Sequence, residues 1–205
     1  MRAVFAIDPG ASPGFALIDL DTPVPTQGRA AMPRYAILAM GNELQTTLTP
    51  HFDDLSGGFV CIVEYQYTGR VTNHEISARS VVRLALRAGL AAGQALTLGA
   101  THCHAVIPQV WKSALVRGMG QVRKEICTNR IRANLLPQEC EQLAVFPKAM
   151  QADILDAIGL AWSYGRLTPD QLAKTKIDFA QWPRVYDGID PVGSPSYRTQ
   201  RRRAC

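Results

Sequence analysis

The sequence lacks features that would assign it to several common classes. Its five cysteines include no C-x-x-C pair, and no window approaches the roughly 18 continuous apolar residues of a membrane span. Scattered cysteines are typical of reduced thiols in a reducing compartment. The apolar run after Arg2 is only five residues long before Asp8, which is too short for a signal peptide. We therefore expect a cytoplasmic protein that makes no membrane contact.

A zinc site is not favoured either. His102 and His104 would point to one side of a strand and Cys103 to the other. No second pair of ligands is nearby, and structural zinc sites need four ligands. The favoured interpretation is a strand with polar edges.

Positive charge is concentrated in two segments. The net charge is +5, and four arginines near the C-terminus account for four of these charges. The segment 109–136 contains six basic residues against one acid, Glu125. Such a local surplus predicts a surface that binds a polyanion. The residues expected to contact nucleic acid include Lys112, Arg117, Arg123, Lys124, Arg201, Arg202 and Arg203.

Hydrophobic periodicity predicts an α/β fold. Strands are expected at 3–8, 14–20, 35–40, 59–65 and 102–107, and helices at 44–55, 73–98, 108–116, 121–135 and 150–167. Residues 21–34 and the segment containing Pro137 and Pro147 are expected to be loops. Three meandering strands followed by strands between helices imply a five-stranded mixed sheet flanked by helices. Residues 1–167 are predicted to form this domain, and 168–205 an extension with a mobile, Arg-rich end.

Four acids occupy positions where a charge is costly to bury. Asp8 and Glu64 each follow an uninterrupted apolar strand, and Asp153 and Asp156 lie three residues apart on one face of the last helix. Any one of them alone is best explained as a cap or a surface charge. Together they would repel one another unless cations neutralise them. Carboxylates without histidine or thiolate favour Mg²⁺ or Mn²⁺, and two such ions about 4 Å apart can hydrolyse a phosphodiester.

Four segments carry a resemblance to a known family. In order they read "AIDPGASPGFALID", "VEYQY", "IPQVWKSALVRGMGQVRKEI" and "ADILDAIGLA". Together they resemble the RuvC group of Holliday-junction resolvases, which are RNase H-like nucleases, over about residues 1–165. The compact core with a basic tail is consistent with a phage version, located in the cytoplasm of a bacterial cell or a phage-infected host.

The resemblance implies a fold, a reaction and residue roles. It implies an RNase H-like domain in which Asp8, Glu64, Asp153 and Asp156 bind two Mg²⁺ ions, with Mn²⁺ able to substitute. It places Lys112 and Lys124 near the scissile phosphate and Tyr67 against a base near the crossover. It also implies a homodimer, because two symmetric nicks need two sites related by a two-fold axis. The products would carry a 5′-phosphate and a 3′-hydroxyl; whether a helicase partner exists is left open.

Several alternatives remain open. Without the resemblance, Lys112 and Lys124 are explained about as well as helix-surface lysines, and Tyr67 as a core residue. The same four acids would suit a nuclease acting on RNA or on branched DNA in general, and a basic chain of this kind also suits a non-catalytic DNA-binding dimer. An actin-type ATP-binding domain needs a second phosphate loop and a second lobe, which are absent from the sequence. A related 3′→5′ exonuclease needs Asp-x-Glu on the first strand, where this chain has Gly10.

Overall fold

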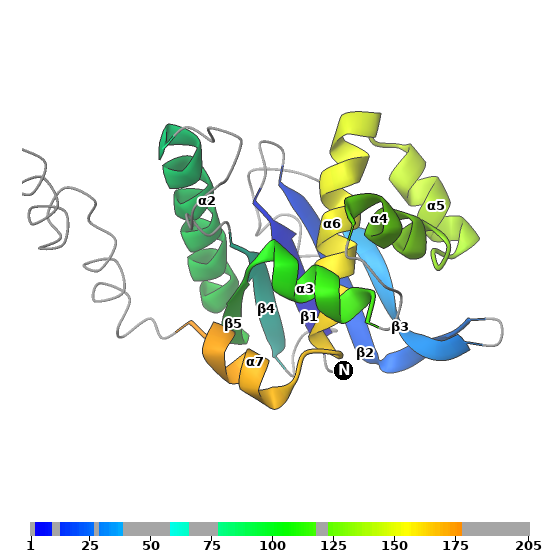
Figure 1. The fold of residues 1–205 in the computed structure, drawn as a ribbon, viewed down its shortest axis with the longest axis horizontal. Coiled ribbons are helices and arrows are strands. Elements are labelled where there is room, and N and C mark those ends of the chain that lie inside the picture. The colour runs from blue at the N-terminus through cyan, green and yellow to red at the C-terminus, as the bar shows by residue number, and fades with distance from the viewer. Residues whose placement is uncertain are drawn as a thin grey trace, which may run out of the picture.

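Strands and helices form where the apolar patterns recur, and a computed structural model (Figure 1) describes residues 3–9, 13–26, 29–38, 58–65, 78–117 and 123–177. The strands are β1 (Ala3–Asp8), β2 (Gly14–Thr26), β3 (Arg29–Leu38), β4 (Phe59–Glu64) and β5 (Ala100–Val106). The helices are α2 (Ala78–Thr97), α3 (Pro108–Leu115), α4 (Lys124–Arg132), α5 (Pro137–Ala144), α6 (Lys148–Tyr164) and α7 (Pro169–Thr175). The expected helix at 44–55 lies outside the described residues.

The strands join in one sheet with the order β3-β2-β1-β4-β5. The pairs β1–β2 and β2–β3 are antiparallel, whereas β1–β4 and β4–β5 are parallel. Helix α2 makes the crossover between β4 and β5, since parallel neighbours cannot be joined by a tight turn. The α/β architecture with a mixed sheet flanked by helices is therefore confirmed.

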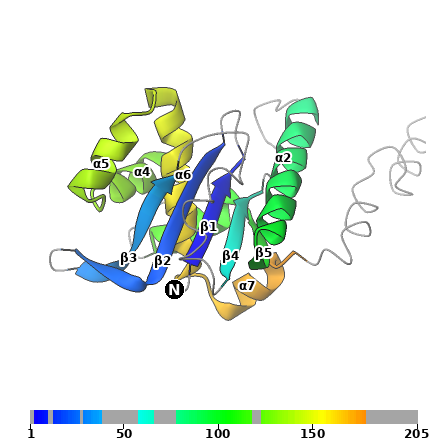
Figure 2. The same cartoon turned by 180° about the vertical axis from the view of Figure 1, so that it is seen from behind.

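Each face of the sheet is covered by helices, which explains why β1 and β4 carry apolar side chains on both faces up to their final acids. Along β1, Val4 and Ala6 pack in the cluster that contains α3 and α6, and Phe5 and Ile7 pack in the cluster that contains α2. Figure 1 shows α3 and α6 in front of the sheet, and in the reverse view of Figure 2 the sheet lies in front of α6. Side-chain parity along a strand thus decides which helix layer a residue meets.

The prediction of a loop at 21–34 was wrong. Strand β2 continues to Thr26 and β3 begins at Arg29, so most of this segment forms a ribbon that extends beyond Ala3, the first residue of β1 (Figure 1). Pro23 and Pro33 face each other in the ribbon, next to a register shift. Prolines are tolerated there because the ladder is already irregular, and this reverses the loop prediction made from the same prolines.

The loop prediction around Pro137 was also wrong, because α5 occupies Pro137–Ala144. Pro137 is the first residue of that helix, where its missing N–H costs nothing and its fixed φ favours the helical turn. The Leu136 backbone N–H donates to Glu139 Oε2 at 2.6 Å, which closes the N-terminal turn. Pro137 therefore marks the start of a helix, whereas the loop prediction treated it as a break in the chain.

The segment after residue 167 returns to the sheet. Thr168 caps α7 by accepting from the Gln171 N–H at 3.2 Å, and Pro169 is its first residue. Lys176 then forms an antiparallel bridge with His104, and the Ile177 N–H donates to the Cys103 carbonyl at 2.8 Å. Part of the predicted extension is thus ordered against β5. Of the helices that the structure describes, none combines the length and apolarity needed to cross a membrane.

Candidate active site

Asp8 and Glu64 lie side by side at the carboxyl ends of two parallel strands. Ile7 pairs with Val63 in the β1–β4 ladder, so the residue after each is an acid at the same level of the sheet. Asp8 and Glu64 share the parity of Val4, Ala6 and Ile62, which pack on the α6 side. Both side chains are buried, with 9% and 5% exposure. The strand ends therefore present two carboxylates to the helix layer.

Gly14 allows the α6 backbone to approach this pair closely. It is the antiparallel partner of Asp8, at the start of β2. A Cβ at Gly14 would overlap the Asp153 carbonyl group and would lie 2.7 Å from the Ile154 backbone nitrogen. Only a residue without a side chain fits this contact. The sequence thereby lets α6 sit directly on the strand opposite Asp8, with Asp153 at the contact and Asp156 one turn further on.

The four carboxylates influence one another. Burial and, in decreasing order, the negative charges of Glu64, Asp156 and Asp153 together raise the pKa of Asp8 from 3.8 to about 8. Burial, followed by the charge of Asp156, also raises the pKa of Asp153. Such shifts arise where carboxylates gather out of water without enough positive charge. Perturbed titratable groups of this kind are typical of functional sites.

Two lysines supply part of the missing positive charge. Lys112 Nζ on α3 lies 3.7 Å from Asp156 Oδ2, and Lys124 Nζ at the start of α4 lies 3.3 Å from the same atom. The Asp156 charge is the main cause that raises the pKa of Lys124. The structure therefore brings both sequence-predicted lysines to the acids. Lys124 has a 62% exposed side chain, so its ammonium group is reachable from solvent.

Trp111 is a site residue that the sequence reasoning missed. Its indole Nε1–H donates to Glu64 Oε2 at 2.7 Å, and the side chain is fully buried. Burial raises the pKa of Glu64, and this hydrogen bond and the charge of Lys112 oppose the rise. Only the position of Trp111, directly before Lys112 in a motif already singled out, could have drawn attention to it.

The donor set fits a hard divalent cation. Within the described residues, neither a hydrogen bond nor an ion pair reaches the Asp8 carboxylate, although it is buried beside three other acids. The four residues offer only carboxylate oxygens, which Mg²⁺ and Mn²⁺ prefer. In the present side-chain positions Asp156 pairs with two lysines. In the part of the chain that is described, no three His, Cys, Asp or Glu side chains lie close enough together to ligate one ion.

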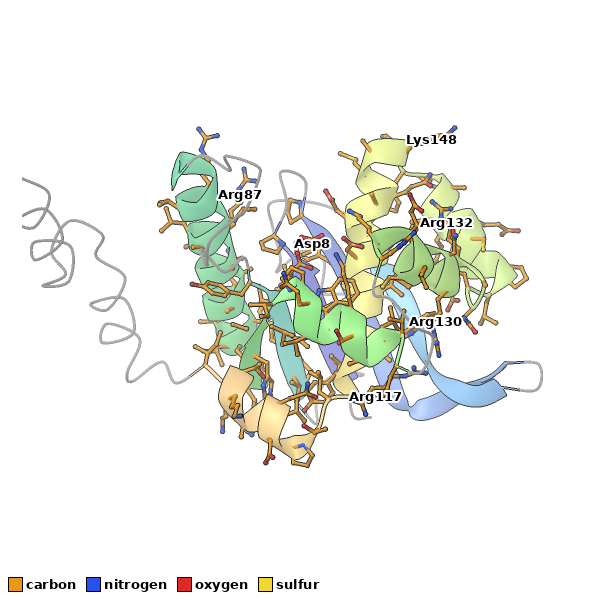
Figure 3. All side chains as sticks on the ribbon, in the orientation of Figure 1. Asp8, Arg87, Arg117, Arg130, Arg132 and Lys148 are labelled. Atoms are coloured by element: carbon orange, nitrogen blue, oxygen red, sulfur yellow. The ribbon has the colours of Figure 1, made fainter. Side chains whose placement is uncertain are left out.

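The other residues expected to contact nucleic acid are only partly described. Tyr67, Arg201, Arg202 and Arg203 lie outside the described residues. Arg123 is exposed and immediately precedes α4. Arg117 is exposed and donates from Nη2 to the carbonyl of Arg166, just after α6, at 3.3 Å. In Figure 3, labelled cations lie on either side of Asp8, with Arg87 on α2 and with Arg132 and Lys148 on α4 and α6.

No protein-family model and no curated protein sequence matches the chain. Among solved structures, it is similar to Thermus thermophilus RuvC, with 18% identity and a TM-score of 0.43 over 80% of this chain and 93% of that one. It is also similar to T. thermophilus RuvC in complex with a Holliday junction substrate, with 16% identity and a TM-score of 0.43 over 86% of this chain and 99% of that one. Both are likenesses of the fold.

Proposed function

We propose that the chain is a divalent-metal-dependent endonuclease that nicks branched DNA. The supporting observation is the gathering of four acids from β1, β4 and α6, with the Asp8 pKa raised to about 8 by burial and by the other three. A fold gains nothing in stability from such a cluster, since each buried charge is costly without a partner. A site that binds cations accounts for the cluster.

Asp8, Glu64, Asp153 and Asp156 are the proposed ligands of two Mg²⁺ ions, for which Mn²⁺ can substitute. Bound divalent ions of this kind supply an activated water and stabilise the leaving oxygen of a phosphodiester. Asp8 lies on β1, the central strand of the sheet, so it would be the residue to hold both ions. The proposed products carry a 5′-phosphate and a 3′-hydroxyl.

The proposed role of Lys112 and Lys124 is to offset the negative charge of the scissile phosphate. Both ammonium groups already lie within 4 Å of an acid of the site. A lysine acts on a phosphate as a mobile point charge and not as a bidentate clamp. Exposed cations on both sides of Asp8 in Figure 3 would continue this attraction along a DNA backbone.

The four-way junction is the proposed substrate because the sequence motifs resemble the RuvC group. Two symmetric nicks in a junction need two sites, so the proposed active form is a homodimer. Tyr67 is proposed to stack on a base near the crossover, where stacking contributes about 1–3 kcal/mol per base. Arg117, Arg123 and Arg201–Arg203 are proposed to add salt-sensitive affinity for the backbone.

A cleavage panel tests the proposal. Labelled four-way, three-way, flap and linear DNA and a branched RNA are incubated with the protein in Mg²⁺, in Mn²⁺ and in EDTA. We expect nicking of the four-way junction with either metal and none in EDTA. Junction binding without nicking in both metals would contradict the proposal and indicate a non-catalytic DNA-binding protein, and preferential cleavage of RNA would contradict the substrate.

The matched variants are Asp8→Asn and Asp170→Asn. Asp170 is an exposed acid on α7, a helix that carries none of the four acids, so its variant controls for loss of one negative charge. We expect Asp170→Asn to nick as the parent does, and Asp8→Asn to bind the junction but to nick at least about a thousandfold more slowly, since ion-assisted chemistry contributes several kcal/mol. Nicking retained in Asp8→Asn would remove Asp8 from the site.

A further inference from the structure

Trp111 connects three components of the acid site. Its Nε1–H donates to Glu64 Oε2 at 2.7 Å, so α3 is joined to the end of β4. Lys112 Nζ lies 4.7 Å from the centre of the Trp111 ring and 3.7 Å from Asp156 Oδ2, so the same ring supports the lysine that pairs with α6. A cation over an indole face is attracted by the ring quadrupole. One buried side chain thus contacts both an acid and a cation of the site.

The indole is seated in a notch on α6. A Cβ at Gly159 would lie 2.8 Å from Trp111 Cζ3 and 3.3 Å from Cη2, so the ring rests where any other residue would place its side chain. Gly159 follows Asp156 by three residues, which puts the notch one turn along the same helix. The ring therefore packs on α6 at Gly159, in a space that it shares with Ile131 of α4, and from there its indole N–H donates to Glu64.

A role in packing alone accounts for the burial of Trp111 but not for its hydrogen-bond partner. A buried indole N–H needs an acceptor, and a backbone carbonyl would satisfy it without placing it beside an acid cluster. Here the acceptor is a carboxylate oxygen of one of the four acids. Partners that hydrogen-bond a ligating carboxylate fix its orientation, and their loss typically weakens metal binding about 10- to 100-fold.

We infer that Trp111 is a positioning residue that holds the Glu64 carboxylate in the orientation in which it receives a divalent cation. The inference rests on the proposed function, because it assumes that Glu64 is a metal ligand. In this role Trp111 acts through Glu64, to which its indole N–H donates. Phenylalanine at this position keeps an aromatic ring but lacks the N–H donor and the outer indole atoms Cζ3 and Cη2 that lie against Gly159.

Calorimetric titration with Mn²⁺ tests the inference without relying on activity. We expect Trp111→Phe to bind Mn²⁺ about 10- to 100-fold more weakly than the parent. Trp162→Phe changes another buried tryptophan, on α6, and is expected to bind as the parent does. Parent-like binding by Trp111→Phe would overturn the role of Trp111 and leave the proposed function intact, whereas absence of Mn²⁺ binding by the parent would contradict the proposed function itself.

A second measurement uses the unaltered protein, in case Trp111→Phe does not fold. In ¹⁵N-labelled protein the indole N–H resonances of Trp162 and Trp182 are assigned from their own Phe variants, which leaves that of Trp111. Titration with Mg²⁺ is expected to shift the Trp111 resonance and to leave the Trp162 resonance in place. In Glu64→Gln the Trp111 shift should be lost. A Trp111 resonance that stays in place while calorimetry shows metal binding would overturn the inference.

Discussion

Helices α6 and α2, which pack on opposite faces of the sheet, differ in how much of their surface is buried. In α6, ten consecutive residues from Ile154 to Ser163 are buried, because the helix lies between the sheet and α3, α4 and α5. In α2, the buried side chains among residues 82–97, the part of the helix whose side chains are described, are alanines, and three large apolar residues on the outer face are 57–68% exposed. These exposed residues are Val82, Leu86 and Leu90.

The difference explains where the candidate chemistry lies. Acids that must share cations need positions fixed to within about 0.5 Å, which a helix packed on both sides provides. Asp153 and Asp156 are on that helix, and Lys112 and Lys124 come from the helices that pack on it. Within the described ranges, helix α2 packs mainly on strands β1, β4 and β5, and it contributes none of the four acids. We expect substitutions to have unequal effects on the two helices.

The largest contrast should come from the same substitution on each helix. Leu155 on α6 is fully buried, and Leu90 on α2 is 68% exposed. Leu155→Ala should lower the free energy of unfolding by about 2–5 kcal/mol because it leaves a cavity, and Leu90→Ala should change it by less than about 0.5 kcal/mol. Urea unfolding followed by circular dichroism measures both. Equal losses in the two variants would contradict the comparison.

The next effect concerns pH. Because the Asp8 pKa is raised from 3.8 to about 8, the folded protein binds a proton that the unfolded chain has released between these values. The metal-free protein should therefore lose stability as pH rises from about 5 to 9. Asp8→Asn removes this cost and should raise Tm at pH 8.5 by several degrees, since 1 kcal/mol corresponds to roughly 2–4 °C in a chain of this size. Calorimetric scans of the parent and of Asp8→Asn in EDTA at pH 5 and at pH 8.5 measure the gain in Tm. A gain in Tm that is larger at pH 5 than at pH 8.5 would contradict the raised pKa of Asp8.

A smaller effect is expected from filling two glycine positions. Gly14→Ala places a Cβ against the α6 backbone and should cost about 1–3 kcal/mol of stability. Gly93 lies within α2, and a Cβ there has no neighbour within 4 Å, so Gly93→Ala should stabilise the fold by about 0.5–1 kcal/mol. Chemical denaturation distinguishes the two signs. A tolerated Gly14→Ala would mean that α6 does not rest directly on β2.

The smallest effect concerns one cation beside the acids. Lys124→Ala should slow junction nicking about tenfold, equivalent to roughly 1.4 kcal/mol, because one charge near the phosphate is lost. Lys174→Ala removes an exposed lysine from α7 and should leave the rate unchanged. Single-turnover rates in Mg²⁺ compare the two. If both variants slow equally, the effect comes from overall charge and not from the position of Lys124.

The sequence predicted β1 and α6 well because a single pattern of apolar residues marks each of them. Strand β1 is an apolar block ended by Asp8, and α6 repeats apolar residues around two acids three positions apart, so both were placed within a few residues. The meeting of Asp8 with Glu64 followed from their places at the ends of apolar strands. The convergence of these acids with the two lysines is visible in the structure, whereas their roles remain proposals.

The two wrong loop predictions came from prolines, whose structural effect depends on their position. Proline ends a helix or begins one, and Pro137 begins α5. It breaks a central strand but is accepted in an irregular ribbon, as Pro23 and Pro33 are in β2 and β3. The hydrogen bond from Trp111 to Glu64 joins residues 47 positions apart, and no local pattern encodes such a pairing. It depends on the notch at Gly159, which only the packed helix reveals.

The bridge between Lys176 and His104 has a practical consequence. It occupies an outer strand of the sheet, whose unpaired backbone groups would otherwise be a template for a neighbouring molecule. A protein truncated after Leu167, the boundary that the sequence suggests, would lose this protection. Self-association of such a shortened chain would then reflect exposed β5 backbone, so the oligomeric state should be measured with residues 168–177 retained.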